Sequence, residues 1–344
     1  RSGWADAKRS YMQGDASVRA YERLTKPDGS RAILMISPPR PDGPPIRYGK
    51  SYSALARLAE DIRPFIAIDQ GLRAQSLSAP KIFAFDAQAG LAVLEDFGTL
   101  GVVDEQGPLA ERYSEATAVL ASLHARDLPS EVPVTDEESY CIPRYDVDAL
   151  LIEVELILDW YAPHIARAGL NSGARATFLN LWKPHLEKVC AARATWTLRD
   201  YHSPNLIWLP EREGLNRVGI IDFQDCVQGH PAYDLVSLLQ DARVDVPDEL
   251  ELKLLGHYTR QRRHDTPDFD VTEFARSYAI MGAQRATKIL GIFARLDRRD
   301  GKPQYLAHLP RVERYLAKDL AHPDLALLRA WYAEYLPRAI ASHA

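Results

Sequence analysis

The sequence predicts an α+β protein with two lobes, a small β-rich N-terminal lobe and a larger, mostly helical C-terminal lobe. Short apolar runs separated by turn residues, as in β-hairpins, dominate the chain up to residue 97. Apolar residues at helical spacing dominate from residue 109 onward. The 344 residues are 46% hydrophobic, which is enough to bury the core of two lobes. We therefore divide the chain into an N-terminal lobe, 1–97, and a C-terminal lobe, 98–344.

Runs of β-prone residues alternate with turns in the N-terminal lobe. The predicted strands are residues 18–24, 31–36, 81–85 and 91–95. The proline-rich residues 38–45 predict a surface loop between the two hairpins. Leu55, Leu58 and Ile62 recur at helical spacing and predict a short helix over 52–62. This lobe is therefore expected to hold two hairpins with one helix between them.

Helical periodicity runs through the C-terminal lobe. The predicted helices are residues 109–125, 147–168, 174–192, 235–242 and 278–296. His124 lies at the end of the first helix and is expected to be structural rather than a ligand. The sequence has no His-x3-His pair, no Gly-x4-Gly-Lys-Ser/Thr loop and no Gly-x-Ser-x-Gly motif. Zinc enzymes, P-loop nucleotidases and serine hydrolases with those motifs are therefore disfavoured.

Charge, cysteine usage and hydropathy limit the partners and the cellular compartment that are expected for the protein. The net charge of −5 gives no global basic field, so nucleic acid is disfavoured as a partner. Three widely separated cysteines, Cys141, Cys190 and Cys226, lack metal-ligand spacing and indicate reduced thiols in a cytoplasmic protein. No apolar run approaches the roughly 20 residues of a membrane span, so no membrane association is expected. No feature indicates an obligate protein partner.

The segment 198–222 contains the residues that are expected to carry out the reaction. It contains Asp200, then Asn205 five positions on, and then an apolar run that ends at Asp222 in the sequence Ile-Ile-Asp-Phe. Two β-prone runs joined by a polar, glycine-containing stretch predict a hairpin that brings Asn205 beside Asp222. Phosphoryl transfer needs a carboxylate to orient the acceptor hydroxyl and oxygen ligands for Mg²⁺. Asp200 is therefore the candidate catalytic base, and Asn205 and Asp222 are the candidate magnesium ligands.

This segment resembles the aminoglycoside phosphotransferase group of small-molecule kinases, which are relatives of protein kinases. The group carries His-Gly-Asp-x4-Asn, then Ile-Asp-Phe or Ile-Asp-Trp, then Gly-x4-Asp-Leu. The matching residues here are Asp200, Asn205, Ile221-Asp222-Phe223 and the stretch from Gly229 to Asp234-Leu235. The resemblance implies a bilobal, protein-kinase-like fold that uses ATP and Mg²⁺. Leu198 stands where the group usually has its first histidine, which supports the loop and takes no part in the chemistry.

The resemblance also implies roles in nucleotide binding. In these kinases the loop before the first hairpin contacts the phosphates, which makes Ser17 and Arg19 candidate phosphate ligands. The sequence Leu-Glu-Asp-Phe-Gly matches the hinge between lobes, so the backbone of Glu95 and Phe97 is expected to contact adenine. Asp234 is expected to brace the catalytic loop. The N-terminal lobe is accordingly expected to be the nucleotide-binding lobe.

One residue that such kinases use is missing. They place a lysine on the second strand of the hairpin to pair the α- and β-phosphates, and Met35 stands at or near that position. Either another cation replaces the lysine, or catalysis has been lost. The nearest replacements in sequence are Arg31, Arg47 and Lys50. We favour replacement, because the base and both metal ligands are retained. Glu60, on the predicted helix 52–62, is either a partner for that cation or a solvated charge.

The late helix 278–296 points to the substrate. Its Gln-Arg-x-x-Lys-x-Leu-Gly-Ile-Phe-Ala-Arg-Leu pattern resembles a bacterial branch of this group that phosphorylates the anomeric hydroxyl of N-acetylmuramate and N-acetylglucosamine in cell-wall recycling. That branch also reads Ile-Asp-Phe-Gln-Asp at the metal strand and lacks the usual lysine. A sugar kinase is therefore predicted, with Arg285 and Lys288 as candidate sugar contacts. Asp225 is a candidate for substrate or a second metal, or else caps a turn.

Two other functions stay open on the sequence. One is a kinase for another small molecule, such as an aminoglycoside or a choline-like compound. A cationic substrate should favour an acidic rim, whereas the late helix here is basic. The other is a nucleotide-binding regulatory protein without turnover, which the methionine at position 35 suggests.

Overall fold

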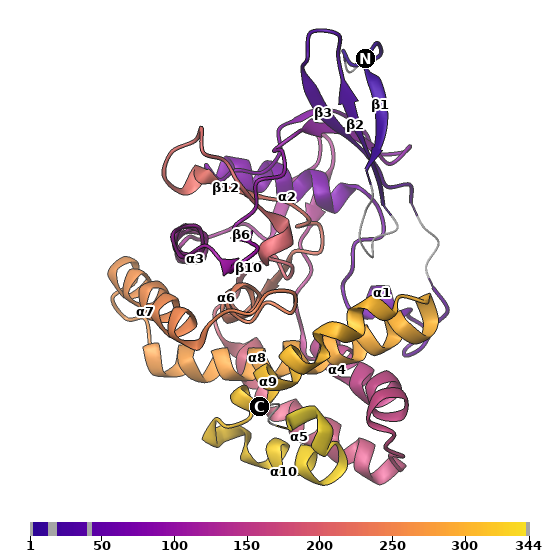
Figure 1. Cartoon of the computed structure of the whole chain (residues 1–344), viewed down its shortest axis with the longest axis vertical. Coiled ribbons are helices and arrows are strands. Elements are labelled where there is room, and N and C mark those ends of the chain that lie inside the picture. The colour runs from indigo at the N-terminus through magenta and orange to yellow at the C-terminus, as the bar shows by residue number, and fades with distance from the viewer. Residues whose placement is uncertain (1–2, 13–18, 40–42, 342–344) are drawn as a thin grey trace.

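A five-stranded antiparallel sheet forms the N-terminal part of the computed structural model, which describes residues 3–12, 19–39 and 43–341 (Figure 1). Its strands follow the order β1-β2-β3-β5-β4. The strands are β1 (Lys8–Met12), β2 (Ala20–Thr25), β3 (Arg31–Ile36), β4 (Ile82–Asp86) and β5 (Leu91–Glu95). Both predicted hairpins are present, as β2–β3 and β4–β5. The strand β1 was not predicted, because its sequence KRSYM is mostly exposed and shows no apolar alternation.

The register of the sheet decides which side chains share a face. Tyr21 lies opposite Met35, and Ile33 lies opposite Leu94. Directly opposed residues of antiparallel strands point to the same face, and the face alternates along each strand. Tyr21, Ile33, Met35 and Leu94 therefore all point toward one side of the sheet.

The helix predicted over 52–62 is wrong beyond its first turn. Helix α1 covers only Tyr52–Leu55, and Arg57 follows with a left-handed backbone, φ 59°. A second helix, α2 (Arg63–Ala74), begins after this connection, with Pro64 in its first turn. Glu60 therefore lies between two helices. Apolar spacing alone could not reveal the break, because Leu58 and Ile62 keep the helical period across it.

The C-terminal part is mostly helical, which confirms the predicted α+β class (Figure 1). Its helices are α3 (Ala110–Ala125), α4 (Val147–Leu156), α5 (Ser172–Ala191), α6 (Ala232–Leu239), α7 (Asp248–Asp265), α8 (Val271–Asp300), α9 (Leu309–Asp319) and α10 (Ala326–Tyr335). A π-helical segment (Ile157–Ala166) continues α4. The division at residue 97 stays a prediction. Within the described residues, no helix is both long and apolar enough to span a membrane.

Short elements connect these helices. Four small two-stranded sheets pair β6 (Val103–Asp104) with β7 (Gly107–Pro108), β8 (Glu131–Pro133) with β9 (Ser139–Cys141), β10 (Thr195–Thr197) with β13 (Val227–Gly229), and β11 (Leu206–Trp208) with β12 (Val218–Ile220). Single 3₁₀ turns cover Ser203–Asn205, Gly214–Arg217, Pro303–His308, Pro323–Leu325 and Pro337–Ile340. The β11–β12 pair is the predicted hairpin of the 198–222 segment.

Helix α8 is the central support of the C-terminal part. It packs against α4, the π-helical segment, α6 and α9. Its N-terminus is capped by Asp270, which accepts hydrogen bonds from the backbone N–H groups of Thr272 and Glu273. A Cβ at Gly291 would lie 2.4 Å from the carbonyl carbon of Leu156, so only glycine allows this close approach. The helix is thereby held close to the end of α4 and the start of the π-helical segment.

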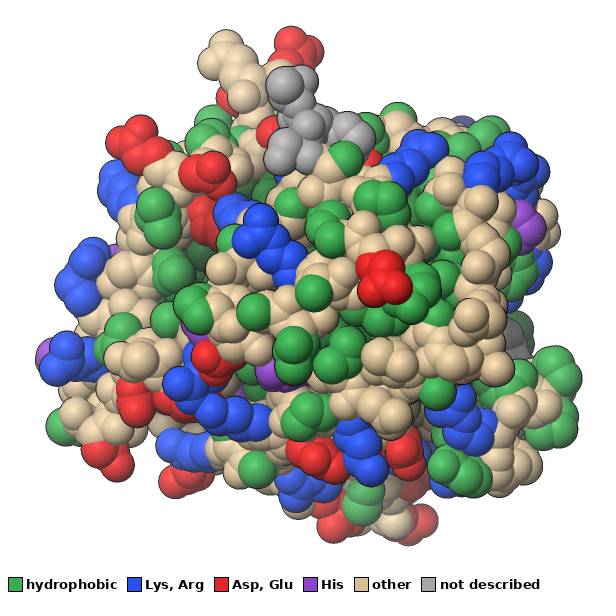
Figure 2. Space-filling view, turned by 90° about the horizontal axis from the view of Figure 1, so that it is seen from below, with side chains coloured by type: hydrophobic (Ala, Val, Ile, Leu, Met, Phe, Trp, Pro, Cys, Tyr) green, Lys and Arg blue, Asp and Glu red, His purple; other side chains and the backbone are tan. Residues whose placement is uncertain are grey.

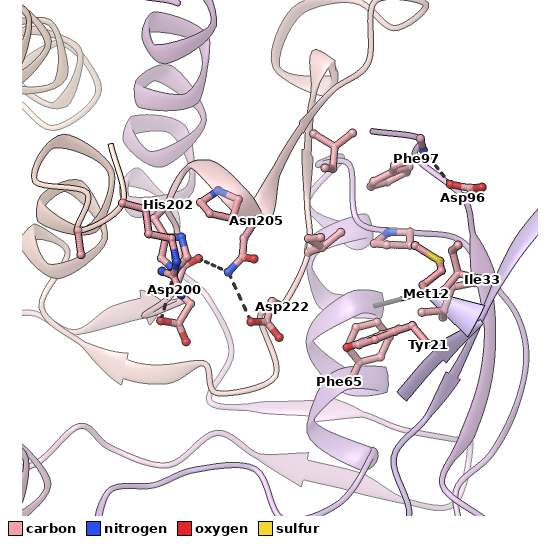
Figure 3. Close-up of a pocket in the computed structure, with 18 of the residues that line it drawn as sticks. Met12, Tyr21, Ile33, Phe65, Asp96, Phe97, Asp200, His202, Asn205 and Asp222 are labelled. Carbon is pink, nitrogen blue, oxygen red and sulfur yellow. Dashed lines mark hydrogen bonds and ion pairs between the residues drawn. The ribbon is translucent and has the colours of Figure 1, made fainter. Parts of the chain in front are cut away.

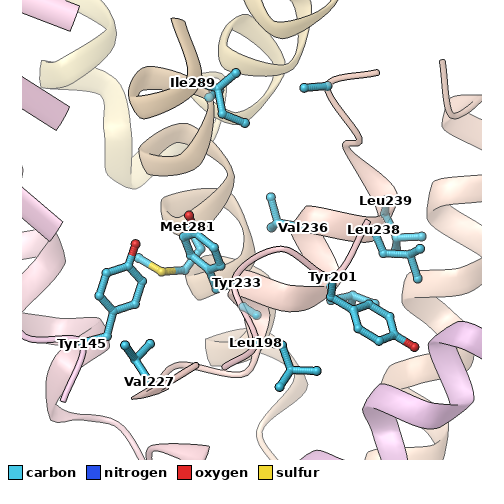
Figure 4. Close-up of a cluster of buried hydrophobic side chains, with 14 of the residues drawn as sticks. Tyr145, Leu198, Tyr201, Val227, Tyr233, Val236, Leu238, Leu239, Met281 and Ile289 are labelled. Atoms are coloured by element: carbon cyan, nitrogen blue, oxygen red, sulfur yellow. The ribbon is translucent and has the colours of Figure 1, made fainter. Parts of the chain in front are cut away.

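A buried cluster underlies the catalytic segment. Figure 4 shows Leu198 and Tyr201 within a cluster of buried side chains that also includes Tyr233 and Met281. All four side chains are at most 1% exposed. Leu198, where related kinases usually carry histidine, therefore supports the loop through apolar packing.

The surface mixes charges of both signs. In Figure 2, Lys and Arg side chains are interspersed with Asp and Glu on the face seen from below. Across the described residues visible from that side, no wide field of one sign appears. This mixture agrees with the small net charge of −5 and offers no broad electrostatic footprint for a polyanion on that face.

Candidate active site

A pocket of about 520 Å³ lies where the sheet, α2, the β11–β12 hairpin and α8 meet (Figure 3). Its apolar side is lined by Met12, Tyr21, Ile33, Phe65 and Leu94. Its polar side is lined by Asp200, His202, Asn205, Asp222, Arg243 and Arg285. The pocket is large enough for a small ligand, and Glu95, Asp96 and Lys288 add further polar groups to its lining.

The hairpin brings the three predicted reacting residues together. The pairing of β11 with β12 ends with the N–H of Ile221 donating to the carbonyl of Asn205 at 3.0 Å. Asn205 Nδ2 donates to the backbone carbonyl of Asp200 at 2.9 Å and lies 3.5 Å from Asp222 Oδ2 (Figure 3). Because the amide nitrogen is engaged in this way, Oδ1 is the atom of Asn205 that is suited to face a cation.

Helix α6 holds the loop that carries Asp200. Asp234, whose side chain is fully buried, accepts hydrogen bonds from the backbone N–H groups of Leu198 at 2.7 Å and Arg199 at 2.8 Å. Ser237 donates to the carbonyl of Arg199 at 3.1 Å. Arg199 has a left-handed φ of 67°, and these bonds offset the cost of that conformation. Asp222 also has a left-handed φ, 59°. One strained residue directly precedes Asp200, and the other is itself a candidate magnesium ligand.

Asp200 is ionised and reaches the pocket. Its side chain is 42% exposed, and its Oδ1 atom lies 3.8 Å from His202 Nε2. Burial alone would raise the pKa of Asp200, but nearby positive charges, those of His202 and Lys288 foremost, hold it below its ordinary value. Burial lowers the pKa of His202 itself. His202 follows Asp200 by two positions and was not predicted as a site residue.

Arg19 is a cation that the structure places beside Asp222, one of the two candidate magnesium ligands. Its Nη1 atom lies 2.7 Å from Asp222 Oδ1, and its side chain is 14% exposed. Burial opposes its charge most strongly, but the combined interactions with Asp222, Tyr21 and Asp225 outweigh burial and raise the pKa of Arg19. Gln224, which the sequence did not single out, donates to the same Asp222 oxygen at 3.1 Å. Ser17, the other predicted phosphate ligand, lies outside the described residues.

The three cations proposed to replace the strand lysine lie elsewhere. Arg31 is exposed at the start of β3. Arg47 forms an ion pair with Glu155 at 2.7 Å, and Lys50 pairs with Arg47 through the backbone. None of the three lines the pocket. Nearness in sequence was a poor guide here, because the chain leaves the sheet after β3 and returns only at β4.

An apolar cluster occupies the region where protein kinases have a lysine–glutamate ion pair. Met35 is 1% exposed and shares a buried cluster with Phe65 of α2 and Phe223. The rings of Phe65 and Phe223 are stacked with centroids 4.9 Å apart. In protein kinases the strand lysine pairs with a glutamate of the neighbouring helix. Glu60 precedes α2 and does not line the pocket. Helix α2 contributes the aromatic ring of Phe65 to the pocket lining.

The predicted hinge lies along one edge of the pocket. Residues 95–98 line it. The side chain of Glu95 pairs with Arg212 at 2.6 Å, and the Arg212 guanidinium lies 5.0 Å from the centroid of the Phe97 ring. A Cβ at Gly219 of β12 would lie 2.7 Å from the Phe97 ring. The hinge is therefore packed directly on the catalytic hairpin.

The predicted substrate residues have different surroundings. Lys288 lines the pocket but pairs with the buried Glu153 at 2.8 Å, which also pairs with Arg199. Asp225 does not line the pocket and accepts a hydrogen bond from the N–H of Ala59 at 2.7 Å, so it anchors the connection between α1 and α2. Arg285 lines the pocket and is 5% exposed.

Arg243 is a pocket residue that sequence reasoning missed. It lies in the connection between α6 and α7, and its Nη1 atom is 3.4 Å from His202 Nε2. No motif surrounds it in the sequence. Its position depends on how that connection folds back toward α8, which local patterns do not encode.

Asp222 and Asn205 suit a magnesium ion. In the described part of the chain, no three His, Cys, Asp or Glu side chains gather to hold a metal. Mg²⁺ commonly takes one or two carboxylates and completes its shell with water and substrate phosphates. The Arg19 guanidinium already lies beside Asp222, so the surroundings of this carboxylate accommodate positive charge. One carboxylate and one amide oxygen therefore fit the ion when a nucleotide supplies the remaining ligands.

Comparison with known proteins agrees with this geometry. Residues 10–273 match APH, the phosphotransferase enzyme family. The N-acetylmuramate/N-acetylglucosamine kinase of Caulobacter vibrioides is 41% identical, over 98% of this chain and 94% of its own length. The kinase of the same name from Pseudomonas putida is 31% identical, over 93% of this chain and 86% of its own length.

Solved structures share the fold at low sequence identity. Choline kinase LicA from Streptococcus pneumoniae matches with a TM-score of 0.57 and 14% identity, over 92% of this chain and 96% of that one. Ethanolamine kinase from Plasmodium vivax matches with a TM-score of 0.57 and 11% identity, over 95% of this chain and 84% of that one. The expected kinase-like fold is thereby confirmed. Because the family match and the Caulobacter relative each cover most of the sequence, the chain belongs to the phosphotransferase enzyme family.

Proposed function

We propose that this chain is an ATP- and Mg²⁺-dependent kinase that phosphorylates the anomeric hydroxyl of N-acetylmuramate and N-acetylglucosamine. The observation that carries the proposal is the meeting of Asp200, Asn205 and Asp222 in one pocket, which the predicted hinge, Arg243 and Arg285 also line. The choice of sugar rests on the two full-length relatives that bear that name.

Asp200 is the proposed base. It is ionised at neutral pH, and its exposed carboxylate faces the pocket. A sugar hydroxyl that donates a hydrogen bond to it is oriented toward the γ-phosphate and gives up its proton as the new P–O bond forms. The bonds from α6 to the backbone of Leu198 and Arg199 fix the direction of the Asp200 side chain.

Asn205 and Asp222 are the proposed ligands of Mg²⁺. The ion supplies charge neutralisation on the phosphate oxygens. Asp222 contributes a carboxylate and Asn205 its Oδ1 atom. Gln224 and Arg19 hold the carboxylate in place through Oδ1.

Arg19 is the proposed replacement for the strand lysine. It lies directly before β2 and two positions before Tyr21, so a continuation of the strand's alternation would direct its side chain to the same side as Tyr21 and Met35. When the charge of Asp222 is shared with a metal ion, the guanidinium of Arg19 is available to donate to phosphate oxygens. A guanidinium from the residue just before β2 would then supply the charge that Met35 on β3 lacks.

The adenine is proposed to lie between the apolar side of the pocket and the hinge. Ile33, Leu94 and Met12 offer flat apolar contact. The backbone of Glu95 to Phe97 offers the polar groups, because the side chain of Glu95 is turned toward Arg212. This arrangement leaves the Asp200 side of the pocket for the sugar.

A nucleotide-binding protein without turnover is the second candidate, and the buried Met35 is the observation that favours it. Release of ADP separates the two functions. The purified protein should release ADP with N-acetylmuramate and N-acetylglucosamine. It should release none with the 1-O-methyl glycoside of N-acetylglucosamine, whose anomeric oxygen is blocked. Binding of ATP without turnover on either free sugar would exclude the kinase.

A further inference from the structure

Arg285 has an unusual environment for a buried cation. Its side chain belongs to α8 and lines the pocket, and the residue is 5% exposed. It forms no hydrogen bond or ion pair with any residue that the structure describes. Lys288, one turn further along the same helix, contrasts with it, because Lys288 pairs with Glu153 and donates to Tyr233. The difference sets Arg285 apart as a cation without a fixed counter-ion.

A buried guanidinium without a counter-ion is costly. Removing such a charge from water costs several kcal/mol unless an opposite charge or hydrogen-bond acceptors compensate. Arg285 is near enough to Asp200 to lower the pKa of Asp200, but the two side chains form no ion pair. The charge of Asp200 is also required at the reacting hydroxyl. The structure thus keeps a donor-rich cation in the lining of the proposed sugar site and gives it no ion-pair partner among the described residues.

The surroundings of Arg285 favour an anionic group on a sugar. His202 and Arg243 line the same pocket near Asp200, and Arg243 lies 3.4 Å from His202. Ile289, Ile292 and Phe293 of α8 add an apolar wall beside Arg285. A planar guanidinium matches a carboxylate through two parallel hydrogen bonds, which a lysine cannot reproduce.

The two proposed sugars differ by one such group. N-acetylmuramate is N-acetylglucosamine with a lactyl ether on O3, and the lactyl group ends in a carboxylate. C3 is separated from the reacting C1 by a single ring carbon. When the C1 hydroxyl contacts Asp200, the lactyl group therefore lies close to Asp200. The distance between them is comparable to the length of an arginine side chain.

We infer that Arg285 binds the lactyl carboxylate of N-acetylmuramate and so sets the preference between the two sugars. The inference rests on the proposed function. In this inference Arg285 contacts the substrate. Lys288 already pairs with Glu153 and therefore has a structural role in holding α8, the helix that carries Arg285. In this proposal the lactyl carboxylate of the substrate forms the ion pair with Arg285 that no described residue of the protein forms.

Substitution of Arg285 tests this in the intact chain. Arg285→Gln should lower kcat/KM for N-acetylmuramate relative to N-acetylglucosamine by roughly 10- to 100-fold, the range for a lost charge-assisted hydrogen-bond pair. Arg285→Lys should recover part of the lost preference. The KM for ATP serves as a check that the nucleotide side is intact. Equal losses on both sugars would overturn the inference, because a supporting role alone predicts that result.

A change in the substrate gives a second test that needs no variant. The unaltered enzyme should use N-acetylmuramate better than its lactyl amide, in which the carboxylate is neutral, by a similar factor. Arg285→Gln should discriminate little between the acid and the amide. Equal use of acid and amide by the unaltered enzyme would also overturn the inference. If the enzyme phosphorylates neither free sugar, the proposed function itself has failed, and that outcome is distinct from loss of discrimination.

Discussion

Arg19 and Asp222 are 203 positions apart in the sequence, yet Nη1 of one lies 2.7 Å from Oδ1 of the other. The pair joins the residue directly before β2 to the segment that follows the β11–β12 hairpin. It also places a positive charge where a kinase must neutralise phosphate oxygens. The absence of the strand lysine is therefore compatible with catalysis, provided that Arg19 acts on the phosphates.

Substitution of Arg19 should reveal that role. Arg19→Gln is expected to lower kcat/KM for ATP by about 100-fold, since it removes a charge-assisted contact of roughly 1.5–3 kcal/mol. Arg19→Lys should retain part of the activity, because the charge is kept while the two-pronged geometry is lost. Arg31→Gln, at the exposed start of β3, is the matched control. ATP kinetics that do not change in Arg19→Gln would exclude it as the replacement cation.

The roles of Asp200 and Asp222 should separate in kinetics. Asp222→Asn is expected to lower turnover by orders of magnitude and to raise the Mg²⁺ concentration needed for half-maximal activity. Asp200→Asn should lower turnover by a comparable factor while leaving the Mg²⁺ requirement and ATP binding close to normal. Titration of magnesium at saturating ATP and sugar distinguishes the two variants.

Asp225→Asn is a suitable control for that pair. Asp225 is three positions from Asp222 but contacts the backbone of Ala59 outside the pocket. Its replacement should affect thermal stability more than the magnesium requirement. Near-normal activity in Asp222→Asn would reject the assignment of the metal site.

The sequence predicted the β11–β12 hairpin because such a hairpin is local in the chain. Asn205 and Asp222 flank the two strands, and alternating apolar residues and turn signals specify such a hairpin within a short stretch. The two hairpins of the N-terminal sheet were predicted for the same reason. Once the hairpin forms, the positions of Asn205 and Asp222 follow from strand pairing.

The missed features depend on contacts between distant segments. The left-handed Arg57 ends α1 within a sequence whose apolar spacing continues, and α2 with Phe65 went unrecognised. The contact of Arg19 with Asp222 and that of Lys288 with Glu153 each join elements far apart in the chain. Periodicity reports which face of an element is buried but not which element covers it.

The contact between Phe97 and Gly219 predicts a further effect on nucleotide binding. A Cβ at residue 219 would lie 2.7 Å from the Phe97 ring, so Gly219→Ala must displace the hinge or the hairpin. We expect the KM for ATP to rise by about 10-fold or more, with a smaller change in the KM for the sugar. Gly256→Ala in α7 is the control, because its Cβ would meet only the flexible end of Arg260 at 3.3 Å. An unchanged KM for ATP in Gly219→Ala would mean that the hinge does not hold the nucleotide.

Asp69 of α2 links stability to pH. It is 1% exposed, and its two carboxyl oxygens have no hydrogen-bond partner among the described residues. Burial raises the pKa of Asp69 from 3.8 to about 8. Between these two values the folded chain keeps the proton that the unfolded chain releases. The contribution of Asp69 to folding stability therefore falls as pH rises from about 4 to 8, by at most about 1.4 kcal/mol per pH unit, and levels off above pH 8.

Asp69→Asn removes this titration with little change in volume. The gain in Tm of the variant over the unaltered protein should therefore be larger at pH 8 than at pH 5, as measured by thermal unfolding in buffers of equal ionic strength. Glu187→Gln, which alters a carboxyl that is 55% exposed on α5, should show no such trend. If the Tm difference for Asp69→Asn is the same at both pH values, Asp69 is ionised in the folded state. The helix that carries Phe65 into the pocket would then contain a buried charge instead of a neutral carboxyl group.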